Sequence, residues 1–122
     1  MVYMVERQDT DIISVIFNGA VALAERKEAV NAVCSLCHPK ESPRILVDVR
    51  EITMNMSLDE QQYFGEYLAN REELADAKVA VLHNGKDNPN AIIDACAYGE
   101  GYYVAEFNRL PEAVAWLQGA MK

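Results

Sequence analysis

Basic residues are scarce in this chain of 122 residues. It has 11 lysines and arginines against 19 aspartates and glutamates, which leaves a formal net charge of -8 at pH 7. Nucleic-acid backbones and anionic lipid surfaces repel such a charge at long range, and no local cluster of basic residues opposes the effect. We therefore expect no nucleic-acid partner.

Cysteines and long apolar runs are also scarce. The chain has 3 cysteines, and an odd number with two of them in a C-x-x-C arrangement makes a poor disulfide framework. No stretch approaches the length that spans a membrane, and the first residues, MVYMVERQ, lack the basic and apolar regions of an export signal. We therefore expect a cytoplasmic protein that does not insert into membranes.

No linker, internal repeat or low-complexity tract interrupts the chain. Hydrophobic residues make up 51% of it and charged residues 25%, which is ordinary for a folded protein. A chain of this length can bury one hydrophobic core without disulfides. We expect a single domain over residues 1–122.

The segment 43–68 contains a predicted strand, a polar turn and a predicted helix. The run Ile45 to Val49 is apolar and rich in β-branched residues, which is typical of a strand covered on both faces. Ser57 and Glu60 have the spacing of a capping box, so a helix is expected to begin there and to lay an apolar stripe from Phe64 onwards against the sheet. Gly65 inside this helix predicts a close approach by a neighbouring backbone.

Similar patterns place the other elements. Asn88 and Pro89 are the expected N-cap and first-turn residue of the third helix, and His38-Pro39 is expected to stop the first. The order ββαβαβαβα predicts an α/β fold with a five-stranded mixed sheet, in which strands two to five are parallel and the first is antiparallel at one edge. The remaining expected strands cover residues 2–7, 12–18, 78–83 and 102–107, and the helices cover about 21–37, 88–98 and 111–117.

This architecture, with DVREITMNMS after the third strand and FNRLPEAVAWL near the end, resembles the SpoIIAA-like family of STAS-like or Sec14-like bacterial domains. The most specific matches are Asp48 with Arg50, and Phe107 with the E-A-x-x-W-L motif at 112–117. The resemblance covers nearly the whole chain and implies a SpoIIAA-like (STAS-like) superhelical fold. Members are small cytoplasmic domains, frequently dimeric and mostly without an assigned activity, so the resemblance implies no reaction.

Better-known relatives, the anti-sigma-factor antagonists, carry D-S-S-G at the start of the second helix, with a serine that a partner kinase phosphorylates. Ser57 falls on the first serine of that motif, whereas Leu58 replaces the usual acceptor and Asp59 replaces the glycine. A phosphate on Ser57 would gain the helix dipole but meet the carboxylates of Asp59 and Glu60. We therefore interpret Ser57 as an N-cap.

The segment from Cys34 to His38 has the C-x-x-C-H spelling of covalent haem attachment. Both cysteines share the apolar face of the first predicted helix with Val30 and Val33, and they lie near its C-terminus, where the helix dipole disfavours a thiolate. A zinc site would need a further ligand from Cys96 or His83 in other segments. We expect buried, reduced cysteines with no metal and no cofactor.

Polar residues gather in the loops that follow the strands, at the carboxyl edge where open α/β sheets bind ligands. Three helix N-termini are expected there, which favours a carboxylate or phosphate, and two methionines could form an apolar lip or fill the core. A solvated polar rim is the plainer interpretation, and no nucleophile with a base and an orienting residue can be assembled. The candidate ligand-binding residues are Arg50, Met54, Met56, Ser57, His83, Lys86, Asn88 and Asn108.

These features favour a non-enzymatic, regulatory STAS-like domain that mediates protein interaction or self-association. The alternative is a carrier or sensor of a small anionic or lipid-like ligand at the carboxyl edge, which a pocket lined by Met54, Met56 and Phe64 would support; a thiol or haem protein is the third. A homodimer is expected because both faces of the strands are apolar, whereas helices in this family lie mainly on one side. The competing possibility is that the first helix crosses to the far face.

Overall fold

The fold has the element order that the sequence predicts. The computed structural model describes residues 3–8, 11–37, 42–85 and 88–119. Its strands are β1 (Tyr3–Arg7), β2 (Ile12–Val21), β3 (Arg44–Met54), β4 (Lys78–Leu82) and β5 (Val104–Phe107). Its helices are α1 (Leu23–Leu36), α2 (Leu58–Ala69), the short 3-10 helix η1 (Glu72–Leu74), α3 (Ala91–Gly99) and α4 (Leu110–Gln118).

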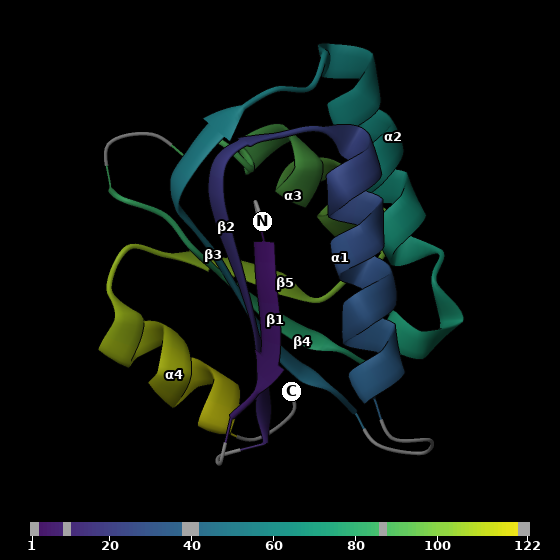
Figure 1. Cartoon of the computed structure of the whole chain (residues 1–122). Coiled ribbons are helices and arrows are strands. Elements are labelled where there is room, and N and C mark those ends of the chain that lie inside the picture. Colours follow the sequence, from purple (N-terminus) through teal and green to yellow (C-terminus); the bar gives the residue numbers. More distant parts are fainter. Residues whose placement is uncertain (1–2, 9–10, 38–41, 86–87, 120–122) are drawn as a thin grey trace.

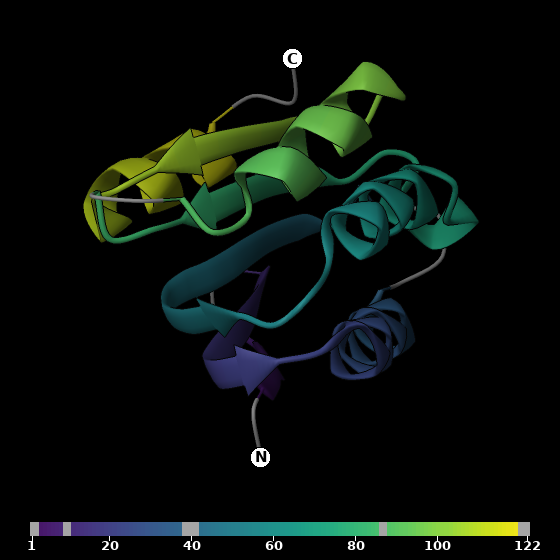
Figure 2. The same ribbon diagram turned by 90° about the horizontal axis from the view of Figure 1, so that it is seen from above.

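The strands form one five-stranded sheet in the order β1-β2-β3-β4-β5. Strand β1 is antiparallel to β2, and the other neighbouring pairs are parallel, as predicted. Figure 2 shows the strands following one another from β1 to β5. This monotonic order brings the carboxyl ends of four strands to one edge of the sheet, close to the starts of α1, α2 and α3.

Strands β2 and β3 are longer than expected. They continue to pair up to Val21 and Met54, past an irregularity between Ile16 and Asn18. Because the two strands satisfy each other's backbone groups along this extension, polar side chains can sit in it facing solvent. Met54 is therefore the last residue of β3, whereas the sequence prediction placed it in the loop after the strand.

Helices cover the two faces of the sheet unequally. Helices α1, α2 and α3 bury the larger core against Ile13, Val15, Ile45 and Val79 on one face, and α4 packs on the other face. Figure 1 shows α4 on the opposite side of the strands from α1 and α2. The smaller core comprises Ile12, Leu46, Ala80, Leu82, Ala113 and Leu117. The helix that crosses to the far face is thus α4, and the proposed crossing of the first helix is wrong.

Helices α2 and α3 are in close contact at Gly65. A Cβ atom built on this glycine would lie 2.7 Å from the carbonyl oxygen of Ile93 and 2.8 Å from the Cβ of Cys96. Both distances are well inside van der Waals contact. The predicted backbone approach at Gly65 is confirmed, and it holds the first turns of α3 against α2.

Candidate functional site

The residues expected to form one site at the carboxyl edge lie in separate surroundings. Arg50 forms a two-bond ion pair with Asp48, in which Nε donates to Oδ1 at 3.0 Å and Nη2 donates to Oδ2 at 2.8 Å. Its side chain is partly exposed on β3, but its Nε and Nη2 donors are already engaged by Asp48. Lys86 lies outside the described residues.

Ser57 is the N-cap of α2, as predicted. Its Oγ accepts from the backbone N–H of Glu60 at 3.1 Å, and the Glu60 carboxylate accepts from the N–H of Ser57 at 2.9 Å. The reciprocal bonds satisfy two donors that the helix itself leaves free. Ser57 is therefore occupied with capping, while the following Leu58 is 55% exposed.

Three further residues of this edge belong to the core or to a turn. Met56 is buried in the larger core and Met54 packs against it, which is the core-filling alternative for the two methionines. Asn88 is not the N-cap of α3, because the helix begins at Ala91 and Asn90 takes the cap position. The Asn88 Oδ1 instead accepts from the Asn90 N–H at 3.0 Å, a turn in which an asparagine side chain bonds the backbone two residues on.

His83 and Asn108 flank the glycine that follows β4. The Gly85 N–H donates to Nδ1 of His83 at 3.0 Å, and a Cβ on Gly85 would lie 3.2 Å from Nδ2 of Asn108. Gly85 also has a φ of +88°, which favours glycine. These contacts build the loop, and they leave His83 as a half-buried structural residue.

The cysteines also differ from expectation. Cys34 and Cys37 are only half-buried; Cys34 lies inside α1, whereas Cys37 is the C-cap of this helix, which ends at Leu36. Burial raises the pKa of Cys34 to about 11, so its thiol is protonated at neutral pH. Across the described part of the chain, no three His, Cys, Asp or Glu side chains come together in a group that could hold a metal ion. His38 lies outside the described residues.

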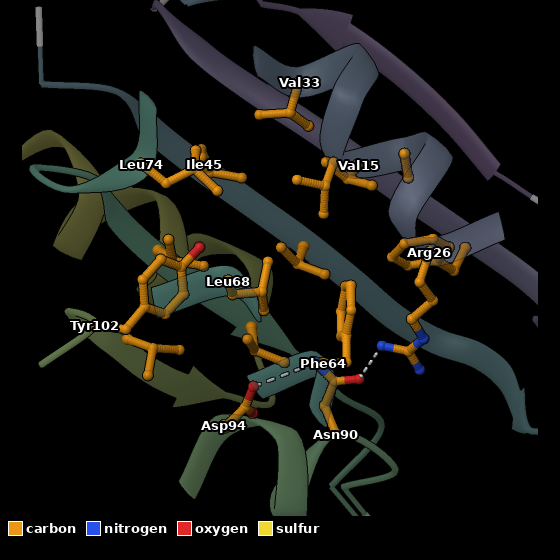
Figure 3. A pocket seen from close by; sticks show the side chains of 17 residues that line it. Val15, Arg26, Val33, Ile45, Phe64, Leu68, Leu74, Asn90, Asp94 and Tyr102 are labelled. Carbon is orange, nitrogen blue, oxygen red and sulfur yellow. Dashed lines mark hydrogen bonds between the residues drawn. The ribbon is translucent and has the colours of Figure 1, made fainter. Parts of the chain in front are cut away.

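A cavity of about 60 Å³ lies between the sheet and helices α1, α2 and α3 (Figure 3). Most of its lining is aliphatic or aromatic. The polar side chains in the lining are Arg26 from α1, Asn90 and Asp94 from the start of α3, and Tyr102. Because α1 follows β2 and α3 follows β4, Arg26 and Asn90 stand near the carboxyl edge of the sheet, where a ligand was expected.

Arg26 is the functional candidate that the sequence prediction missed. It is 1% exposed, its Nη1 donates to Oδ1 of Asn90 at 2.6 Å, and its guanidinium carbon lies 5.2 Å and 5.8 Å from the ring centres of Phe17 and Phe64. Its Nε and Nη2 are buried and have no hydrogen-bond partner among the described residues. Burial lowers the pKa of Arg26 to about 10, against an opposing effect of Asp94, so the side chain remains a cation at pH 7.

Asp94 is buried on the other side of Asn90. Its Oδ1 accepts from Nδ2 of Asn90 at 3.2 Å, and its Oδ2 accepts from Nδ2 of Asn88 at 3.4 Å; the same Asn88 amide also donates to Glu106. Burial raises the pKa of Asp94 to about 8, and the adjacent Glu106 carboxyl adds to the shift. At pH 7 Asp94 is therefore mostly protonated, and Asn90 separates it from Arg26.

Comparison with known proteins gives the fold. No protein-family model matches the sequence, and no curated protein does. SpoIIAA, an anti-sigma factor antagonist, in its unphosphorylated form has a TM-score of 0.63 at 12% identity, covering 97% of this chain and 99% of that one. The Bacillus cell fate determinant SpoIIAA in its phosphorylated form has a TM-score of 0.60 at 13% identity, covering 94% and 98%.

A third solved structure is an uncharacterized protein of the DUF3478 family from Shewanella loihica PV-4, which has a SpoIIAA-like fold. Its TM-score is 0.62 at 16% identity, and the match covers 94% of this chain and 91% of that one. The chain is thus an α/β domain with a mixed five-stranded sheet. Its fold is SpoIIAA-like, as the sequence resemblance implied. In the described ranges no helix is long and apolar enough to span a bilayer.

Proposed function

We propose that this chain is a cytoplasmic, non-enzymatic regulatory domain of the STAS-like class that acts by binding proteins. Its main partner is a second copy of the same chain. The likeness to SpoIIAA, which is described as an anti-sigma factor antagonist, supports a regulatory role. The free thiols of Cys34 and Cys96 suit a reducing compartment. The main support for the proposal is the part of the sheet, on β1 and β2, that α4 leaves uncovered.

This uncovered face lies on β1 and β2 beside α4. Met4 and Ile16 are paired across the two strands and are 57% and 38% exposed, and Leu110 at the start of α4 is 40% exposed. A groove of about 350 Å³ runs next to them. Its lining is Gln8, Ile12, Ser14, Ile16, Leu46, Asp48, Arg50, Leu110 and Val114. Figure 1 shows α4 to one side of β1 and β2, so the helix does not extend over them.

The composition of this face suits an interface between proteins. Large exposed apolar side chains that adjoin one another, with polar groups at the rim, are typical of protein-binding surfaces. A second copy suits the face because Asp48 and Arg50 neutralise each other at its rim, which reduces the local repulsion between two copies of this acidic chain. A two-fold axis would bury the same patch on both copies.

Sedimentation equilibrium at micromolar concentration tests the proposal. The wild-type chain should have the mass of two chains, and Ile16→Lys should shift it to one chain, because a charge at the centre of an apolar interface is costly. Leu58→Lys is the matched control, since Leu58 is also an exposed large apolar residue but lies on α2, on the other side of the sheet. A wild-type mass of one chain over a wide dilution range would exclude self-association.

A second candidate function is the binding of a small anionic ligand as a carrier or sensor. Buried Arg26, with two donors that have no partner among the described residues, favours it. The anionic form of this candidate is better supported than the lipid-like form. A cavity of about 60 Å³ is too small for a long acyl chain, since it has less than half the volume of a cavity of about 150 Å³ that binds benzene.

A further inference from the structure

Strand β5 has one side that no other strand covers. Within the described ranges it is the last strand of the sheet and pairs only with β4. The Val79 N–H of β4 donates to the Tyr103 carbonyl at 3.0 Å, so Tyr103 and every second residue after it face β4. The N–H and C=O groups of Val104 and Glu106 therefore point away from β4, and no backbone hydrogen bond of the described residues uses them. The outer edge of β5 can accept another strand.

A groove of about 280 Å³ runs between this edge and α3. Figure 2 shows β5 as the last strand of the sheet, with α3 beside it. Residues 104–106 form one wall of the groove, and Ala91, Asp94, Ala95 and Tyr98 form the other. The α3 residues have the i, i+3, i+4 and i+7 spacing of a single helix face, and the two alanines leave space beside the strand. An extended chain laid along β5 would thus lie between a strand and a helix.

The groove is acidic. Among the described residues its lining has two acids, Asp94 and Glu106, and no lysine or arginine. The Asn88 amide donates to both carboxyl groups and holds them side by side. A second copy of this chain would bring its own Glu106 and a net charge of -8 to the groove, and a charge on an edge strand opposes pairing of this kind. The occupant that the charges favour is therefore a basic segment of another protein.

Tyr98 adds an apolar contact surface to the groove. Its side chain is 68% exposed, and tyrosines are frequent anchors of protein interfaces. Because α3 runs back along β5, Asp94 lies beside Glu106, and Tyr98, one turn further on, lies towards Val104. Side chains two positions apart point to the same face of an extended chain. A segment on β5 could therefore place a basic side chain at Glu106 and an apolar one at Tyr98.

We propose that the outer edge of β5 binds an extended segment of a partner protein as an additional strand. The segment carries a lysine or arginine that pairs with Glu106 and, two positions away, an apolar residue that packs on Tyr98. Backbone hydrogen bonds to Val104 and Glu106 contribute affinity, and the two side-chain contacts contribute specificity. This inference rests on the protein-binding role proposed above but not on the dimer, because β5 and the uncovered face on β1 and β2 lie at opposite edges of the sheet.

Selection from a display library of random linear octapeptides against the immobilised full-length chain tests the proposal. The enriched peptides should combine a lysine or arginine with a β-branched or aromatic residue two positions away. The best peptide, titrated in solution, should bind about tenfold more weakly to Glu106→Gln and more weakly still to Glu106→Lys, which reverses the charge. Glu66→Gln is the matched control and should keep the wild-type affinity, because Glu66 is an exposed glutamate on α2 outside the groove.

Hydrogen exchange of the backbone amides locates the bound peptide. Exchange at Val104 and Glu106 should slow when the peptide binds, because their N–H groups gain partners. Exchange at Ala105 should change little, since its N–H already faces β4. Tyr98→Ala should lower the affinity for the peptide and leave the fold intact, because the ring is exposed in the free protein.

Peptide binding and self-association can be separated. Ile16→Lys, which should break the dimer, should leave peptide binding unchanged, so a failure of the dimer does not count against the β5 edge. The β5 proposal is overturned if the selection enriches no peptide family, or if the enriched peptides lack basic residues. Equal binding to the wild type and to Glu106→Lys would also overturn it, as would binding without slower exchange at Val104 and Glu106.

Discussion

Arg26 and Asn90, which are 64 positions apart in the sequence, are joined inside the core by a hydrogen bond of 2.6 Å. The bond connects the fourth residue of α1 to the residue that caps α3. Asn90 also donates from Nδ2 to Asp94, so its amide group is hydrogen-bonded both to a cation and to a carboxyl group. The position and the chemistry of this amide make Asn90 the most informative place to perturb the site.

Asn90→Ala should lower the free energy of unfolding by about 2 kcal/mol, because it leaves one more donor of the buried guanidinium unpaired. Asn90→Asp should cost less, since a carboxylate accepts the same bond from Arg26. Urea titrations of the two variants at pH 7 make the comparison. A loss below about 0.5 kcal/mol for the alanine variant would mean that the bond to Arg26 contributes little.

Stability should fall as the pH rises towards 8 because of Asp94. Its pKa is about 8 in the folded chain and about 4 in the unfolded chain. The folded state therefore holds a proton that the unfolded state has released between these values. The stabilisation is complete below about pH 4, decreases as the pH rises and is lost above the folded pKa.

The measurement is the difference in unfolding free energy between the wild type and Asp94→Asn from pH 5 to pH 9. The unfolding free energy of the wild type relative to that of Asp94→Asn should decrease by at most about 1.4 kcal/mol for each pH unit. It should become constant above pH 8. Asn88, Asn90 and Glu106 are the polar groups that face Asp94. Because Glu106 raises the pKa of Asp94, Glu106→Gln should make the curve level off at a lower pH. A difference that does not change with pH would show that Asp94 is ionised throughout.

The order of the elements was predictable because each strand is a short apolar run and each helix has its own start or stop signal. The ends of β2 and β3 were not predictable. Asn18, Arg50 and Glu51 are polar, which favours a loop, but they lie in strands. Their side chains are exposed, and the backbones of Asn18 and Glu51 pair with each other between the two strands. Polarity in such a segment reports on side-chain exposure and does not mark the end of a strand.

The position of α4 could not be predicted from the crossover rule. Right-handed connections between successive parallel strands place α1, α2 and α3 on one face of the sheet. No strand follows α4, so the rule does not constrain it. Its apolar side, with Ala113, Trp116 and Leu117, was evident from the sequence. The choice of face depends on the apolar residues that the first three helices leave uncovered, among them Leu46 and Leu82.

The site was only partly predictable for a different reason. The carboxyl edge follows from the parallel strands, and the capping role of Ser57 follows from its spacing to Glu60. Arg26 was missed because arginine is usually exposed. A signal was present, since Arg26 lies three positions after Leu23 and four before Val30 and therefore falls on the core-facing stripe of α1. A charged residue on such a stripe is a candidate for a buried functional group.

Ser57→Ala should lower stability by about 1 kcal/mol, whereas Ser57→Asp should be nearly neutral, because an aspartate caps a helix as well as a serine does. Denaturant titration compares the two variants with the wild type. Ser35→Ala is a suitable control, since Ser35 lies exposed inside α1 and its Oγ only donates to the Asn31 carbonyl. If alanine at position 57 has no effect and aspartate changes the sedimentation mass, a phosphorylation switch explains Ser57 better than capping.

Gly65→Ala should destabilise the protein even though alanine is the better helix former by about 1 kcal/mol. The added Cβ would lie 2.7 Å from the Ile93 carbonyl oxygen and 2.8 Å from the Cys96 Cβ, so α2 and α3 would have to separate. Overpacking of this kind costs roughly 1–3 kcal/mol, and urea titration at pH 7 should give a net loss of about 1 kcal/mol or more. Gly99→Ala is the matched control, because Gly99 is also helical and a Cβ there meets nothing within 4 Å. Equal stability of the two variants would contradict the close contact that positions Asn90 and Asp94 over the cavity.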